Sequence, residues 1–187
     1  MSLSLKVSLL SLVVLLAACR SDPIHYHTLT PPAQPATGSR GSTDIQIERV
    51  SVPPQVDRPQ IVIRQGNSGL AILETEWWGA SLSDELKSAL VDQLSGMVAQ
   101  RNVSLRVDVQ RFDSIPGQYA LIDVKWRLKT AGSDASSAPL TCRTTLQTSA
   151  GPTIDDLVAA HQKNVKRLAS LISKMASAPF NGCPPAE

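Results

Sequence analysis

Three cysteines, Cys19, Cys142 and Cys183, carry the most distinctive chemistry in the sequence, because a thiol can receive a lipid or form a disulfide. Cys19 follows residues 7–18, an apolar run without a charged side chain that comes after Lys6. The run is shorter than the roughly 20 apolar residues that a transmembrane helix needs, and it has the length of a signal-peptide core. We therefore expect residues 1–18 to direct export and to be removed before Cys19.

The residues just before Cys19 indicate lipid attachment. Leu16-Ala17-Ala18-Cys19 resembles the bacterial lipobox, in which small residues admit the peptidase and the thiol receives diacylglycerol. Two or more acyl chains, such as palmitate, form a stable anchor, since each buried methylene contributes about 0.8 kcal/mol. Arg20, in place of an aspartate, favours the outer membrane over the inner one. The alternative is an ordinary secretory signal followed by a chance cysteine.

The other two cysteines are expected to pair. Export places the chain in an oxidising compartment, and lipidation of Cys19 leaves only Cys142 and Cys183. A bridge between them closes a loop of about 40 residues, worth roughly 4 kcal/mol in the chain-entropy model. It would hold the C-terminal tail against the body of the protein. Two free or intermolecular thiols are the alternative.

The remaining reactive side chains form no recognisable catalytic or metal-binding set. The sequence lacks a Gly-x-Ser-x-Gly elbow, a phosphate loop and a His-Glu-x-x-His motif. His25 and His27 have a spacing that suits a metal, but no third histidine or carboxylate cluster is near them. His161 falls on an apolar helical stripe, which favours a structural role. We expect no metal, no cofactor and no enzymatic activity; an active site assembled across the fold is the competing hypothesis.

Trp77 and Trp78 are the strongest candidates for contact with a partner or a lipid. Tryptophan buries a large area and is enriched in binding hot spots. The pair lies between a predicted hairpin and a predicted helix, so we expect at least one of the two to fill that junction. The net charge of +2, without a dense run of Lys and Arg, gives no indication of a nucleic-acid partner.

These residues are carried by elements that the hydrophobic pattern predicts. Residues 19–43 are rich in Pro and small polar residues and should form a flexible tether, with a short strand at residues 25–29. Strands are expected at 44–52, with one phase shift, and in a hairpin over 60–74. A helix should begin at Ser81 or Ser83 and fray near residue 100.

Three more strands and a second helix complete the expected domain. The strands cover residues 103–109, 119–128 and 140–148, and the helix covers 153–177. The order β-β-β-α-β-β-β-α favours an α/β fold with a mixed, mostly antiparallel sheet that two main helices cover. Residues 44–187 should form a single domain.

Several segments, taken in order, resemble the PqiC (YmbA-type) family of auxiliary lipoproteins of ABC-type or MCE-type transport systems. The resemblance begins with the lipobox cysteine and covers nearly the whole mature chain. The matching segments are Tyr26–Leu29, Ile47–Pro53, Val56–Val62, Trp78–Leu82 and Val124–Leu128. The chain departs from the family pattern at Trp77-Trp78-Gly79, where a polar residue before one Trp and Ala after it are expected.

The resemblance implies a non-catalytic periplasmic subunit that helps to move lipids or other hydrophobic molecules between two membranes and supports envelope integrity. The implied partners are an MCE-domain protein and inner-membrane transport subunits; homo-oligomerisation is left open. A structural envelope lipoprotein and a periplasmic enzyme are the alternatives.

Overall fold

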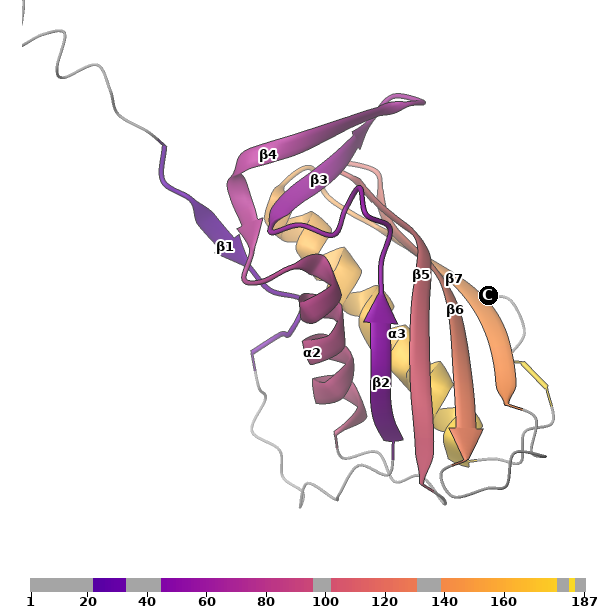
Figure 1. Cartoon of the computed structure of the whole chain (residues 1–187). Helices are drawn as coiled ribbons and strands as arrows, with labels where there is room; N and C mark the ends of the chain where they lie inside the picture. Colours follow the sequence, from indigo (N-terminus) through magenta and orange to yellow (C-terminus); the bar gives the residue numbers. More distant parts are fainter. Residues whose placement is uncertain (1–21, 33–44, 96–101, 131–138, 178–181, 184–187) are drawn as a thin grey trace, which may run out of the picture.

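The computed structural model describes residues 22–32, 45–95, 102–130, 139–177 and 182–183. Within these ranges the chain forms seven strands and two helices (Figure 1). Their bounds are β1 His25–His27, β2 Ile45–Ser51, β3 Gln60–Gln65, β4 Gly69–Trp78, α2 Leu82–Leu94, β5 Val103–Ile115, β6 Tyr119–Thr130, β7 Leu140–Ser149 and α3 Ile154–Ser177. Neither of the two described helices combines the length and apolar character needed to cross a bilayer.

The larger sheet has four strands in the order β2-β5-β6-β7. β2 runs parallel to β5, whereas β5, β6 and β7 are antiparallel neighbours. Alternation along β6 places Val124, Trp126 and Leu128 inside, while Lys125 and Arg127 are exposed. One face of this sheet therefore belongs to the core and the other is open, as antiparallel sheets commonly allow.

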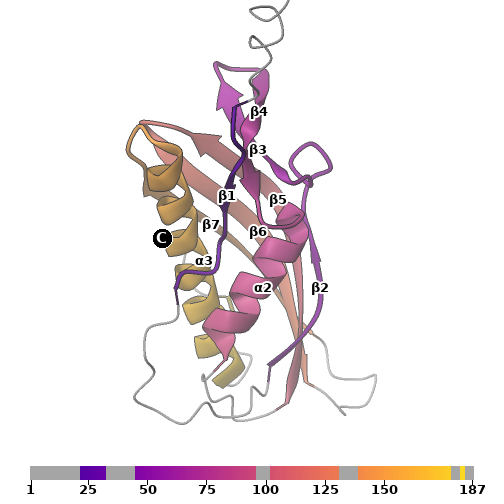
Figure 2. The same cartoon turned by 90° about the vertical axis from the view of Figure 1, so that its left-hand side faces the viewer.

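Both helices cover the core face of the four-stranded sheet (Figures 1 and 2). α2 begins after Ser81, whose hydroxyl accepts a hydrogen bond from the Asp84 amide at 3.3 Å. α3 begins after Thr153, which exchanges hydrogen bonds with Asp156 as a capping box does. Both helices bury an apolar stripe, and each fully buried large side chain contributes about 1.5–3 kcal/mol. The buried apolar positions of the stripes are Leu82, Leu86, Ala89, Leu90 and Leu94 on α2, and Leu157, Val158, Ala160, Val165, Leu168, Ala169, Ile172 and Ala176 on α3.

The smaller sheet has the order β1-β4-β3. β3 and β4 form a hairpin whose turn includes Gly66 at φ +59°, a backbone conformation that favours glycine. The hairpin is linked to the larger sheet because the Arg64 guanidinium on β3 donates to the buried Asp113 carboxylate on β5 at 3.0 and 3.1 Å. β1 pairs in parallel with the end of β4.

The predicted fold class is confirmed, and the structure adds detail that the pattern lacks. The order gains β1 at its start, and the strands divide between two sheets. The phase shift predicted in the first strand is a register shift between Ile47 and Arg49. β5 continues to Ile115, beyond the predicted end at residue 109, because residues 111–115 keep pairing with β6 after a second register shift. The segment predicted as a tether contributes β1 and the buried Leu29 to the fold.

Candidate interaction surface

β1 is fixed to the molecule by two glutamates that come from different elements. Glu76 on β4 accepts hydrogen bonds from His25 Nδ1 at 3.0 Å and from His27 Nε2 at 2.6 Å. His27 also approaches the Asp155 carboxylate through Nδ1, at 3.3 Å. Burial raises the pKa of Glu76, but the hydrogen bonds and charges of the two histidines outweigh this effect and hold the pKa below its usual value. The carboxylate therefore stays ionised and holds the strand.

The second glutamate, Glu85, lies in the first turn of α2 and is almost completely buried. Its carboxylate accepts hydrogen bonds from the Thr28 hydroxyl at 2.8 Å and from the Leu29 amide at 2.9 Å. Gly79 leaves the space for this side chain, since a Cβ there would lie 2.9 Å from Glu85 Oε1. From sequence, Glu85 is expected only to complement the helix dipole; its partners lie more than fifty residues away and leave no local pattern.

These contacts hold three residues of the Tyr26–Leu29 segment in place, and the side chain of the fourth, Tyr26, stays exposed to solvent. His27, Thr28 and Leu29 are tied to the glutamates, and Leu29 is buried. Tyr26 remains 66% exposed, and its ring contacts Trp77 edge-to-face with the ring centroids 6.3 Å apart. The Trp77 ring donates Nε1–H to the Glu74 carbonyl at 2.9 Å, and Trp77 is only partly buried. Tyr26 and Trp77 therefore form a partly exposed pair of rings, which we call the aromatic pair below.

The structure separates the two tryptophans that the sequence places side by side. Trp78 is 3% exposed and contacts the Phe112 ring edge-to-face, so it fills the junction between sheet and helices. Successive residues of a strand point to opposite faces, which is why its neighbour Trp77 lies at the surface. Of the two residues predicted for partner or lipid contact, only Trp77 offers an accessible surface.

His161 lies in the core and has no access to a substrate. It is 1% exposed, stacks on Phe112 with 3.9 Å between ring centroids, and its Nε2 shares a 2.9 Å hydrogen bond with the Ser114 hydroxyl. Burial lowers the pKa of His161 to about 3, so the ring is neutral. Its Nδ1 has no hydrogen-bond partner, and thus no carboxylate orients it as a catalytic base requires. The contact is a buried structural pair.

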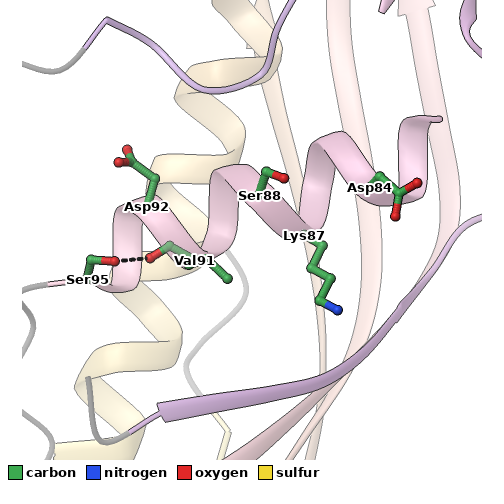
Figure 3. A pocket seen from close by; sticks show the side chains of 6 residues that line it. All are labelled: Asp84, Lys87, Ser88, Val91, Asp92 and Ser95. Atoms are coloured by element: carbon green, nitrogen blue, oxygen red, sulfur yellow. Dashed lines mark hydrogen bonds between the residues drawn. The ribbon is translucent and has the colours of Figure 1, made fainter. Parts of the chain in front are cut away.

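A hollow runs along the exposed side of α2 and is lined by residues of this one helix (Figure 3). Lys87 and Val91 lie on its wall, and Val91 is 48% exposed. The other lining residues are Asp84, Ser88, Asp92 and Ser95. The lining contains no histidine or cysteine. Within the described part of the chain, no group of three or more His, Cys, Asp or Glu side chains could hold a metal ion.

Of the other predicted sites, the structure describes the two paired cysteines and Asp57 but not Cys19. Cys142 and Cys183 are joined in a disulfide with an S–S distance of 2.06 Å, which is the pairing predicted from the cysteine count. Asp57, from one of the segments that carry the family resemblance, accepts a hydrogen bond from the Ser83 amide at 3.1 Å at the start of α2. Cys19 lies outside the described residues, and its lipidation stays a prediction.

The chain belongs to the family described as the ABC-type transport auxiliary lipoprotein component, whose model matches residues 27–173. This is the PqiC (YmbA-type) family predicted from sequence. The protein is thus a lipoprotein associated with ABC-type transport, and it belongs to the cell envelope. Among curated proteins, no match is found.

Two solved structures share the fold. The crystal structure of an uncharacterized protein is 16% identical, with a TM-score of 0.61, over 82% of this chain and 98% of that one. A crystal structure of a protein from Xanthomonas campestris is 19% identical, with a TM-score of 0.59, over 83% of this chain and 94% of that one. At these identities the likeness supports the fold and gives no information on function.

Proposed function

We propose that this protein is a non-catalytic periplasmic subunit of an MCE/ABC-type intermembrane transport system that moves lipids or other hydrophobic molecules. In this role it supports the integrity of the envelope, and its partners are an MCE-domain protein and inner-membrane subunits. The family description supports the association with ABC-type transport. His161 shares a hydrogen bond with the Ser114 hydroxyl, and its burial supports a role without catalysis.

The anchor proposed for this subunit is lipid on Cys19, after removal of residues 1–18, with the outer membrane as its destination. The folded domain follows almost at once, because β1 begins at His25. A fully extended chain spans about 3.3–3.6 Å per residue, so the segment between Cys19 and His25 reaches only about 20 Å.

The main observation in support of the proposal is the aromatic pair, which lies near the short segment between Cys19 and β1. Tyr26 is exposed and Trp77 is partly exposed, although the residues around them are held by Glu76 and Glu85. Tyr and Trp are enriched both in protein binding hot spots and at membrane–water interfaces. We propose that the pair contacts the MCE-domain partner or the lipid surface next to the anchor.

Separate substitutions of the two tryptophans test this contact. Trp78→Ala should lower the free energy of unfolding by about 3–5 kcal/mol, because it leaves a cavity in the core. Trp77→Ala should leave the unfolding midpoint nearly unchanged and weaken capture of the MCE partner by about 2 kcal/mol or more. Thermal unfolding and capture of the partner by the tagged lipoprotein are measured on the same preparations.

The outcomes distinguish the roles. If Trp77→Ala keeps capture but partitions less into lipid vesicles, the pair contacts lipid. Equal losses of stability and capture would assign Trp77 to the core and remove the contact role. The transport assignment fails if the native lipoprotein captures no MCE component and its deletion leaves the envelope barrier intact. A hydrolase activity abolished by one polar substitution would favour an enzyme.

A further inference from the structure

The open face of the four-stranded sheet carries an excess of positive charge. Seven cations lie on it: Arg49, Arg106, Arg111, Lys125, Arg127, Lys129 and Arg143. Their inward neighbours on the strands, such as Val107 and Trp126, are buried under the helices. Among the described residues four carboxylates share this face, Glu48, Asp108, Asp113 and Asp123, so the cations outnumber them although the whole chain has a net charge of just +2. We call this surface the cationic face.

Three of its arginines stand in one row across neighbouring strands. Arg49 on β2 is paired in register with Arg106 on β5, which is paired with Arg127 on β6. Neighbouring strands lie about 4.8 Å apart, so the row spans about 10 Å. Like charges directly opposite each other destabilise a sheet. The row therefore costs stability in the isolated protein, and a bound anionic surface would offset that cost.

The carboxylates on the face neutralise only part of this charge. Glu48 lies 3.6 Å from Arg106, and Asp113 pairs with Arg111. Asp123 accepts hydrogen bonds from Arg143, which keep the pKa of the Asp123 carboxyl below its usual value. Within the part of the chain that the structure describes, Arg49, Lys125, Arg127 and Lys129 make no ion pair. Four cations thus remain available, two of them with the planar guanidinium that binds carboxylates in a bidentate manner.

The position of this face decides between a membrane and a protein as its partner. β1 lies on the helix side of the molecule, and the four-stranded sheet lies on the other side of the helices (Figures 1 and 2). Gln162 on α3 donates to the Thr28 carbonyl at 2.9 Å, which places the end of β1 against the helix layer. The chain thus enters opposite the cationic face, and a membrane that holds residue 19 within about 20 Å of His25 meets the other side.

We propose that the cationic face is a docking surface for an acidic protein surface. The exposed residues between the cations, among them Thr141, Thr145 and Gln147, are polar, so the interface forms through charge and hydrogen bonds. Such an interface gains most in association rate and weakens with salt. This surface is independent of the aromatic pair, since it uses different strands and the opposite side of the molecule.

The test compares two triple variants of the membrane-purified lipoprotein with the wild type, using poly-L-glutamate as the probe. Arg49→Gln/Arg106→Gln/Arg127→Gln removes the row, and Lys163→Gln/Lys166→Gln/Lys174→Gln removes the same charge from the exposed side of α3. Binding is measured at about 0.05 M and about 0.5 M NaCl, where the screening length differs about threefold. Vesicles of phosphatidylcholine, with and without about 30% phosphatidylglycerol, are the second probe.

The row variant should bind poly-L-glutamate at least about tenfold more weakly at low salt, a loss of about 1.4 kcal/mol, while the lysine variant keeps most of the binding. The unfolding midpoint of the row variant should stay equal or rise, because the repulsion between the three aligned arginines is removed. Equal losses in both variants, or no binding by the wild type, would overturn the proposal. The proposal would also be overturned if the wild type preferred vesicles with phosphatidylglycerol and only the row variant lost this preference. The lipid anchor acts equally on both kinds of vesicle, so such a preference would show that the cationic face binds the membrane.

Discussion

Single side chains decide how the N-terminal segment joins this fold. Glu76 and Glu85 each use one carboxylate to hold two groups of the segment, and both are remote from it in sequence. A buried or half-buried carboxylate is stable as an ion only when hydrogen-bond donors surround it. The segment supplies these donors as two histidine rings, a hydroxyl and an amide. The contacts therefore satisfy the glutamates and order β1 at the same time.

This arrangement predicts a pH dependence that belongs to Glu76. Its pKa in the folded protein is lowered from a reference value of 4.5, so the stability that it contributes is present above pH 4.5 and is lost as the pH falls through the folded-state pKa. The free energy of unfolding should fall on acidification in this window, and less steeply in Glu76→Gln. Glu74→Gln is the matched control, because Glu74 lies on the same strand and is exposed. Equal slopes for Glu76→Gln and the wild type would contradict the prediction.

Among the elements, two parts of the chain bury few apolar side chains and are held by other contacts. β1 has only three residues, and its addition to β4 depends on the glutamate contacts and on the hydrogen bond from the Gly79 amide to the His27 carbonyl. After α3, Cys183 is held by the disulfide to Cys142, which lies on β7. In both parts, polar or covalent links replace apolar burial.

The disulfide should contribute measurably to stability. Cys142 and Cys183 are 41 residues apart, and closing a loop of this length contributes up to about 4 kcal/mol by restricting the unfolded chain. The double variant Cys142→Ala/Cys183→Ala should lose about 2–4 kcal/mol in denaturant unfolding, and reductant should lower the wild type by a similar amount. Non-reducing peptide mapping checks the bridge directly. Two free thiols in periplasm-derived protein would refute the pairing.

The whole molecule has two distinct sides, which suits a subunit that joins a membrane to other proteins. β1 lies on the helix side, and the cationic face lies on the opposite side of the sheet (Figure 2). A lipid anchor close to β1 would turn the cationic face away from the membrane. The proposed anchor and the proposed docking face therefore lie on opposite sides of the molecule and can be occupied at the same time.

The anchor itself can be tested on the intact chain. Cys19→Ala should abolish labelling by a fatty-acid probe and release the domain into the soluble periplasmic fraction, because no acyl chain remains to insert. Cys142→Ala is the control that changes a cysteine without touching the lipidation site, and it should keep its label. Acyl labelling that persists in Cys19→Ala would contradict lipidation at this residue.

Most helices and strands can be predicted from the sequence alone, because their signals are local. The apolar stripes with Ser81 and Thr153 predict both helices, and alternation and the turn near Gly66 predict the long strands and the hairpin. The end of β5 was placed too early, since residues beyond 109 lose regular alternation at a register shift that only pairing with β6 reveals.

The residues that form the two candidate surfaces are known only from the three-dimensional packing. The exposure of Trp77 and the burial of Trp78 depend on which face of β4 meets the core. The row of arginines exists because strands far apart in sequence pair in one register. The glutamate contacts of the β1 segment likewise join residues 49 to 57 positions apart. Such pairings depend on how apolar faces pack together, so the periodicity of one segment cannot specify the partner of another.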